Sequence, residues 1–258
     1  MTPQENENIA VIVPAYNEPN ISKTLYGLYT QKVRPEGTHH FVVDNGSTDN
    51  TRDQINAFIY EHADFPLTVL EEAEKGTGAA VDTGFRTAIH QGYSLLARTD
   101  SDTVPTPLWT SRIVYTFSAD QNIQLLGGTS SPLKDEQYRV GDRLLLPAAI
   151  KAARIALSLK NFNTEYLKAV VGHNMATRSD AYVDVGGFER SSIDRMDEDI
   201  DYSLKIAGRY GADAIKIDQR IEVETSMRRI RRYGIGGTAL HHLFPGLRKY
   251  RKNGVDVR

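Results

Sequence analysis

Strand-like and helix-like segments alternate four times in the first half of the chain, and no other feature restricts the fold as strongly. Each strand-like segment is a short apolar run, and each segment after it carries its apolar residues at helical spacing. The strands are expected over residues 9–15, 39–45, 67–72 and 94–100, and the helices over residues 21–31, 51–63, 78–93 and 106–120. This repeat predicts an α/β fold whose mostly parallel sheet is covered by helices on both faces.

Polar residues follow the expected strands at the points where the strands end. Right-handed crossovers place the carboxyl ends of parallel strands at one edge of the sheet, and open α/β sheets bind their ligands at that edge. The polar residues concerned are Asn17, Glu18, Asp44, Asn45, Lys75, Gly76, Asp100 and Asp102. We therefore expect a ligand site at this edge.

The second half of the chain is less regular. A strand is expected over residues 123–131, a long amphipathic helix over residues 139–161, and strand-like segments over residues 213–218 and 220–225. A further helix begins near Asp197, and the residues expected to share its core face are Ile200, Ser203, Leu204 and Ala207. No internal repeat or low-complexity linker divides the sequence, so residues 1–258 are interpreted as a single domain.

Composition narrows the class of protein. Hydrophobic residues make up 40% and charged residues 25% of the 258 residues, which is ordinary for a globular protein. The net charge of -2 does not indicate a nucleic-acid partner, and the lack of cysteine excludes disulfides and thiolate metal sites. The first residues do not resemble a signal peptide, and no apolar run approaches the roughly 20 residues of a membrane span. A soluble, cytoplasmic protein is expected, while peripheral membrane contact through the basic residues 248–252 and a homodimer both stay open.

Two carboxylates flank Ser101, where the fourth strand is expected to end. The simpler interpretation is a pair of solvated loop acids, since short acidic motifs recur by chance. Unpaired like charges repel, however, so a positive group is expected between them. A hard divalent cation takes oxygen ligands and keeps positions for phosphate oxygens, so one carboxylate could bind a metal while the other faces a ribose.

Several short motifs follow one another along the chain. They are "VIVPAYNEPN", "FVVDNGSTDNT", "EKGTGAAVDTGF", "ARTDSDT", "VGHNMATRSDAYVDVGGF", "MDEDIDYSLKI" and "ETSMRRIRRYG". In this order they resemble the family 2 glycosyltransferases, which are inverting enzymes with the Rossmann-like GT-A fold. The resemblance covers residues 9–237. It implies a nucleotide-sugar-binding half (residues 9–104), an acceptor and catalytic half (residues 105–237) and a basic tail (residues 238–258).

The resemblance also implies an activity and the residues that carry it. A sugar would pass from a nucleotide-diphosphate donor, a UDP-sugar by family habit, to an acceptor hydroxyl, with Mg²⁺ or Mn²⁺ bound by Asp102. The residues implied to bind the nucleotide sugar are Pro14, Ala15, Tyr16, Glu18, Asp44, Asn45, Lys75, Gly76, Asp100, Ser101, Arg229 and Arg232. Asp44 would read the nucleoside, and Arg229 or Arg232 would reach the diphosphate, although a basic run is often only a solvated helix. His173 and Asn174 would contact the acceptor, with a core histidine as the alternative.

Acidic residues crowd the start of the helix near Asp197. Acids at a helix N-terminus often only complement the helix dipole, and each then contributes roughly 0.3–1 kcal/mol. The acids here are Asp197, Glu198, Asp199 and Asp201, which are more than capping requires. Inverting transfer needs one carboxylate that accepts a proton from the attacking hydroxyl. The family motif implies Asp199 for this role, with Glu198 positioning it or contacting the acceptor.

The sequence departs from the family pattern in three places. Asn45 stands where a second acid is more common. Val81 and Asp82 stand where the third loop often carries Arg or Asn. A histidine that binds the metal in some relatives is missing near residues 221–226, where Glu222 or Glu224 could substitute. Base recognition and the third metal ligand are therefore open.

Other functions compete with this interpretation. A sugar-phosphate nucleotidyltransferase also uses paired acids and metal, but it usually carries a Gly-rich basic loop after its first strand, which "VIVPAYNEPN" lacks. Another alternative is a degenerate, catalytically weak transferase domain that binds nucleotide sugar as a sensor or scaffold, and the presence of Asp102 and Asp199 argues against it. "GTGAAV" begins like a dinucleotide fingerprint but ends in Val81 after the third strand, which disfavours an NAD site. The acceptor could be a saccharide, a lipid-linked molecule, a peptide or a small metabolite.

Overall fold

The four strand–helix units expected in the first half are present in the computed structural model, which describes residues 7–134, 168–190 and 198–228 and three single positions, 152, 155 and 159. The strands β1 to β4 span Ile9–Ala15, His39–Asp44, Leu67–Glu71 and Leu95–Thr99. The helices α1 to α4 span Ile21–Tyr29, Thr51–Glu61, Thr77–His90 and Trp109–Ala119. Apart from the three single positions, the helix expected over residues 139–161 lies outside the described residues, as does the basic tail.

Within the described ranges, the strands form an eight-stranded sheet in the order β3-β2-β1-β4-β7-β6-β8-β5. The first four are parallel, so their carboxyl ends meet at one edge. β7 (Asn174–Arg178) runs antiparallel to both β4 and β6 (Leu125–Pro132), and the short β5 (Thr103–Pro105) runs antiparallel to β8 (Ile215–Thr225). β8 is one strand where two were expected. Its pairing with β6 shifts register between Gly127 and Thr129, so the middle residues of β8 form an irregularity within the strand and no turn divides it.

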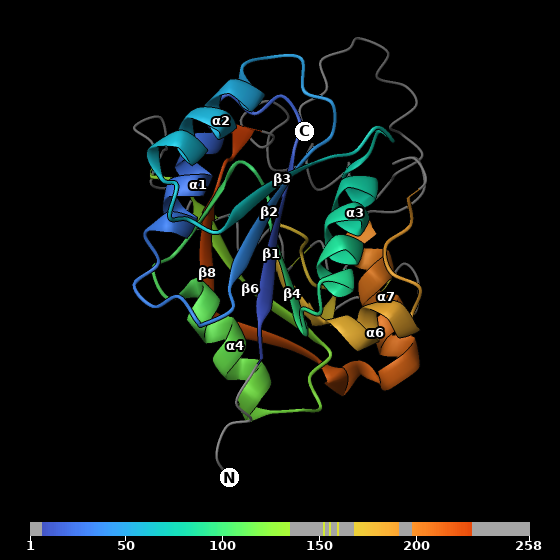
Figure 1. Ribbon diagram of the computed structural model, residues 1–258. Coiled ribbons are helices and arrows are strands. Elements are labelled where there is room, and N and C mark those ends of the chain that lie inside the picture. Colours follow the sequence, from blue (N-terminus) through green and yellow to red (C-terminus); the bar gives the residue numbers. More distant parts are fainter. Residues whose placement is uncertain are drawn as a thin grey trace.

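Alternate residues of β1 belong to two hydrophobic cores, one on each face of the sheet. Ile9, Val11 and Val13 pack with residues of α1, α2 and α4. Ala10 and Ile12 pack on the other face with residues of α3, α6 (Ser179–Asp184) and α7 (Glu198–Tyr210). Figure 1 shows these two groups of helices on opposite sides of the sheet. The expected α/β fold with helices on both faces is therefore confirmed.

Helix α7 packs on the sheet through a face that shares Ser203 and Ala207 with the one expected and differs in its other residues. Its buried residues are Tyr202, Ser203, Ile206 and Ala207. Ile200 and Leu204, which were expected in the core, are only partly buried. The Tyr202 hydroxyl forms a 2.7 Å hydrogen bond with Thr177 Oγ1 on β7, and this bond satisfies its polar atom inside the core. The partner that allows Tyr202 to be buried lies on another element, so the helix sequence alone does not reveal it.

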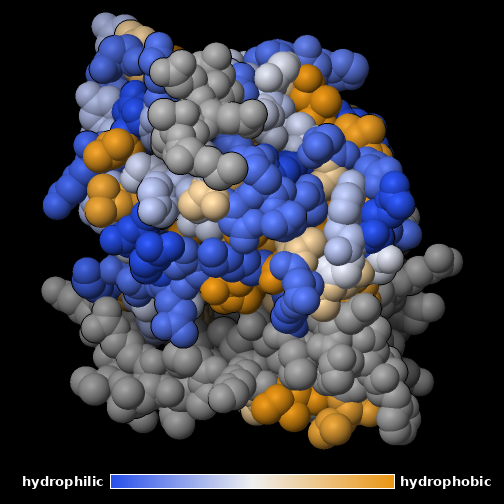
Figure 2. All heavy atoms as spheres, turned by 90° about the horizontal axis from the view of Figure 1, so that it is seen from below, coloured by the Kyte–Doolittle hydropathy of each residue, from blue (hydrophilic) through white to orange (hydrophobic). Residues whose placement is uncertain are grey.

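The described residues give two observations about apolar helices and apolar surface. None of the helices in the described ranges has both the length and the apolar character needed to cross a membrane. On the face in Figure 2, hydrophilic side chains predominate, and the hydrophobic ones form small separate groups. Single exposed apolar residues, such as Tyr60 on α2 and Tyr115 on α4, are ordinary for folded proteins.

Candidate functional site

A pocket of about 330 Å³ lies where β1, β2 and β4 end and α3 begins. Its lining residues are Pro14, Ala15, Tyr16, Asn45, Lys75, Gly76, Thr77, Ala80, Asp100, Ser101, Asp102 and Arg228. All of them except Thr77, Ala80 and Arg228 are among the residues expected from the sequence to bind a nucleotide sugar or its metal ion. The parallel strand directions bring these residues together, since each loop follows the carboxyl end of its strand.

The buried side chain of Asn45 builds the wall of the pocket that follows β3. Its Nδ2 donates to the backbone carbonyls of Glu72 and Glu74 at 2.9 and 2.7 Å, and its Oδ1 accepts the N–H of Gly76 at 2.9 Å. An ionised aspartate has no donor for the two carbonyls. The presence of Asn45 in place of the second acid of the family pattern therefore has a physical reason. This loop requires a side chain that both donates and accepts.

Replacing Asn45 by aspartate should lower the free energy of unfolding by about 1–3 kcal/mol, because the carboxylate would face two buried carbonyl oxygens without a donor. Urea unfolding measures this loss. Asn56→Asp is the matched control, because it makes the same chemical change at an exposed position of α2. Equal stability of Asn45→Asp and the parent would contradict the role assigned to this amide.

Positive charge lines the side of the pocket next to α3. Lys75 Nζ donates to the carbonyls of Asn45 and Gly46 at 2.9 and 3.2 Å and lies 4.5 Å from the centre of the Tyr16 ring. These contacts hold its ammonium group at the pocket, where Gly76 and Thr77 begin α3. Gly76 has a φ of 143°, a conformation that side chains rarely adopt. The N-terminus of a helix beside a lysine favours an anionic group such as a phosphate.

The two acids after β4 each face an arginine of the chain. Arg98 Nε donates to Asp100 Oδ1 at 3.0 Å. Arg228 bridges Asp102 and the buried Glu18, with N–O distances of 3.2 and 2.5 Å. Each acid thus pairs with a different arginine, whereas one positive group between the two carboxylates was expected. Both carboxylates still line the pocket.

Arg98 links the acid after β4 to the acids at the start of α7. Its guanidinium is almost completely buried and also donates to Glu198 Oε1 at 3.1 Å. Burial opposes the charge of Arg98, but Asp100, Glu198 and Asp199 raise its pKa above the usual value. Sequence reasoning missed Arg98. The available signal is an arginine within the otherwise apolar run "SLLART".

Asp199 is held by backbone groups at the first turn of α7. Its Oδ2 accepts the N–H of Gly172 at 2.7 Å, and its Oδ1 accepts the N–H of Ile200 at 2.8 Å. A Cβ at position 172 would lie 2.7 Å from the Arg98 guanidinium, so a side chain there would require the guanidinium to shift. Asp199 and Glu198 are not among the described residues that line the pocket. Glu198 contacts Asp100, which does line it, through Arg98.

Asp44 organises the loop after β2. It is buried, its Oδ1 accepts the N–H of Ser47 at 3.0 Å, and its Oδ2 lies 3.4 Å from Arg52. It is not among the described residues that line the pocket, although the next residue, Asn45, is. A direct contact between Asp44 and a nucleoside stays a prediction.

The two residues expected to contact the acceptor have different surroundings. His173 Nε2 lies 2.6 Å from Ser130 Oγ, and His173 is only partly buried. The Asn174 amide is buried, accepts the indole N–H of Trp109 at 2.8 Å and donates to two backbone carbonyls on β6 and β8. These bonds hold the amide of Asn174 between α4, β6 and β8 in the core, and its contact with the acceptor stays a prediction.

The two arginines considered for the contact with the diphosphate, Arg229 and Arg232, lie outside the described residues. Their neighbour Arg228, which sequence reasoning did not select, lines the pocket. The run of arginines after Met227 was the signal, but which of them faces the pocket depends on where β8 ends. Of the two acids considered as a third metal ligand, Glu224 pairs with Lys134 at 2.9 Å, and neither it nor Glu222 is among the described residues that line the pocket.

Known proteins resemble this chain in sequence. The sequence profile described as Glycosyl transferase family 2 matches residues 10–186. Glycosyltransferase AglE of Haloferax volcanii is 27% identical over 213 residues, which are 77% of this chain and 64% of that protein. Polyprenol monophosphomannose synthase of Mycolicibacterium smegmatis is 27% identical over 124 residues, which are 48% of this chain and 46% of that protein. The chain thus spans less than two thirds of the length of these curated relatives.

Solved structures share the fold. The mannosyltransferase PcManGT from Pyrobaculum calidifontis, in complex with GDP-Man and Mn²⁺, has a TM-score of 0.63 at 23% identity, over 98% of this chain and 66% of that one. Glucosyl-3-phosphoglycerate synthase from Mycobacterium tuberculosis, in complex with Mn²⁺, UDP and glucosyl-3-phosphoglycerate, has a TM-score of 0.61 at 19% identity, over 94% of this chain and 80% of that one. At these identities the likeness establishes the fold, which is that of GT-A glycosyltransferases.

Proposed function

The chain belongs to glycosyl transferase family 2, and on this premise we propose that it transfers a sugar from a nucleotide-diphosphate donor to a hydroxyl group of an acceptor. The transfer is a single displacement that inverts the anomeric configuration and uses Mg²⁺ or Mn²⁺. The family resemblance favours a UDP-sugar. One solved structure with this fold contains GDP-Man and another contains UDP, so the test below includes both bases.

The observation that carries this proposal is the division of charge within one pocket. Lys75, Arg228 and the first turn of α3 supply positive charge, whereas Asp100 and Asp102 supply carboxylate oxygens. A diphosphate needs the first kind of group, and a hard divalent cation needs the second. The pocket volume of about 330 Å³ lies at the lower end of the range for small-molecule sites.

The carboxylates of the pocket fit a divalent cation that is held partly by the donor. Within the described ranges, no group of three or more histidines and acids is arranged to hold a metal ion on its own. Magnesium-like ions are commonly bound by one or two carboxylates together with substrate phosphates and water. Asp102 is the main protein ligand in this proposal, and Asp100 is its neighbour in the pocket. The cation supplies neutralising charge to the leaving diphosphate when bound.

The remaining residues bind the phosphates of the donor, orient the reacting groups and accept the proton. Lys75 and the N-terminus of α3 hold the phosphates, and Arg228 stabilises the diphosphate as it leaves. Asp199 accepts the proton of the acceptor hydroxyl, while the hydroxyl oxygen bonds to the anomeric carbon and the bond from that carbon to the diphosphate oxygen breaks. The N–H groups of Gly172 and Ile200 keep the Asp199 carboxylate oriented.

A binding and hydrolysis assay tests this function. Calorimetry with UDP-sugars and GDP-sugars, in Mn²⁺ or in EDTA, should reveal one donor that binds in Mn²⁺. The bound donor should then be hydrolysed slowly without an acceptor, which a pure binding domain would not do. Absence of binding by every nucleotide-diphosphate sugar would refute the proposal. Turnover of a nucleoside triphosphate with a sugar phosphate would favour the nucleotidyltransferase alternative.

A further inference from the structure

Asp82 on α3 is a buried acid that the proposed reaction does not use. Its side chain is completely buried, and its carboxylate accepts hydrogen bonds from Arg86 Nε at 2.9 Å, from the Tyr182 hydroxyl at 2.8 Å and from Arg190 at 3.0 Å. A buried carboxylate is costly unless it is paired in this way. Asp82 also stands where the family pattern often has Arg or Asn.

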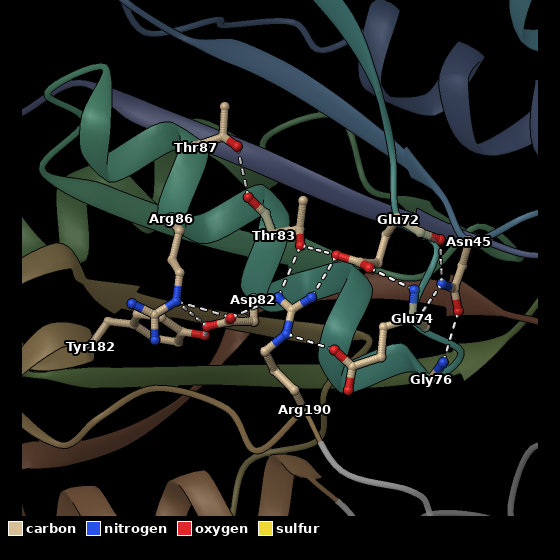
Figure 3. A network of polar contacts seen from close by, with 10 residues as sticks. All are labelled: Asn45, Glu72, Glu74, Gly76, Asp82, Thr83, Arg86, Thr87, Tyr182 and Arg190. Carbon is tan, nitrogen blue, oxygen red and sulfur yellow. Dashed lines mark hydrogen bonds and ion pairs between the residues drawn. The ribbon is translucent and has the colours of Figure 1, made fainter.

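Arg190 joins this acid to the loop after β3. Its guanidinium contacts Glu72 at 2.7 Å, Glu74 at 3.0 Å and Asp82 at 3.0 Å, and it also donates to Thr83 Oγ1 at 3.1 Å. Figure 3 shows the three carboxylates arranged around this one side chain. Arginine suits the site because its fixed fork of N–H donors serves several oxygens at once.

The same loop leads directly to the donor pocket. The backbone carbonyls of Glu72 and Glu74 accept from the Asn45 amide, which in turn accepts the N–H of Gly76. Gly76 and Lys75 line the pocket. Figure 3 shows this continuous path from Arg190 through the two glutamates and Asn45 to Gly76. Arg190 thus contacts the side chains of Glu72 and Glu74 from the second half of the chain, while Asn45 in the first half binds their carbonyls. The Glu72 carboxylate also accepts from Thr83 Oγ1 on α3.

Arg190 also fixes the segment that precedes the proposed catalytic acids. The carbonyl oxygen of Glu189 would lie 2.5 Å from a Cβ at position 78, so the segment lies directly against the first turn of α3 at Gly78. The N–H of Phe188 donates to the Tyr182 hydroxyl, which binds Asp82. In the sequence, residues 191–197 connect this anchored segment to Glu198.

We propose that Arg190 is a positioning residue that couples the acceptor half to the donor pocket by holding the loop of residues 72–76 in its binding shape. The consequence for donor affinity rests on the proposed function, whereas the consequence for the loop does not. A residue that only stabilised the fold would loosen all elements alike when replaced. Arg190 should act on the loop selectively.

Hydrogen exchange on the protein without nucleotide tests the coupling first. Arg190→Gln should accelerate exchange about tenfold at the N–H groups of Glu74 and Gly76, which donate to Glu72 Oε1 and to Asn45 Oδ1. Exchange in β4 should stay unchanged. Arg209→Gln is the matched control, because Arg209 also pairs with an acid, Asp184, but on an exposed surface of α7. If Arg190→Gln does not fold, Arg190→Lys keeps the charge but loses the fork, and the same selective acceleration is expected.

Donor affinity is the second measurement. Arg190→Gln should weaken binding of the donor found in the calorimetric assay about tenfold, within the usual range of coupling between sites, and Arg209→Gln should leave it unchanged. Unaltered exchange over residues 72–76, or equal acceleration there and in β4, would overturn the inference. If the parent protein binds no donor, the proposed function fails, and the exchange data still decide whether Arg190 controls the loop.

Discussion

Replacing Asp199 by asparagine should reduce the turnover number about 10²–10⁴-fold, the usual effect of removing a positioned general base. Donor affinity should stay close to that of the parent protein, because Asp199 does not belong to the described lining of the pocket. Asparagine has nearly the same shape, and its carbonyl oxygen can still accept the Gly172 N–H, so the first turn of α7 should keep its position. Steady-state rates and donor binding by calorimetry measure both quantities.

The control for Asp199→Asn is Asp201→Asn, which removes a carboxylate from the same helix turn. Asp201 pairs with Lys205 at 2.8 Å on α7 and has no role in the proposed reaction. This control variant should keep most of the activity. The product formed by the parent should have inverted anomeric configuration at the transferred sugar. Full turnover of Asp199→Asn, or a product of retained configuration, would exclude Asp199 as the base of an inverting displacement.

Replacing Asp102 by asparagine should abolish the dependence of donor binding on Mn²⁺. The parent should bind the donor more than about tenfold more tightly in Mn²⁺ than in EDTA. Replacing even an outer-shell partner of a metal ligand typically lowers metal affinity or activity about 10–100-fold. The variant loses the charged oxygen that the cation requires, while Glu18 still pairs with Arg228. Its affinity should therefore be low and equal in Mn²⁺ and in EDTA.

Asp213→Asn provides the comparison for the metal experiment, because Asp213 is a fully exposed acid that pairs with Lys168 outside the pocket. This variant should behave like the parent. Circular dichroism should first show that the Asp102→Asn variant is folded. If the parent binds its donor equally well in Mn²⁺ and in EDTA, the metal has no part in donor binding, and Asp102 loses the role proposed for it.

The architecture of the first half and the position of the pocket could be predicted from the sequence, because both depend on local patterns. Apolar runs and helical spacing identify the four strand–helix units, and the handedness of their connections places the strand ends at one edge. Asn45, Lys75, Gly76, Asp100 and Asp102 follow strands in the sequence, so they had to meet in space. The need for an amide at position 45 appeared only when its three backbone partners were known.

The pairing of charges was decided by the tertiary structure alone. Arg98 meets Glu198, which is 100 positions away, because antiparallel β7 lies beside β4 and brings the second half of the chain to that strand. Arg190 meets Glu72, 118 positions away, and Arg228, which the sequence did not single out, lines the pocket. An ion pair depends on distances of a few ångströms, and here these distances join segments that lie far apart in the sequence. The sequence alone therefore determined the sheet edge and its polar residues, and only the packed chain determined which arginine holds which acid.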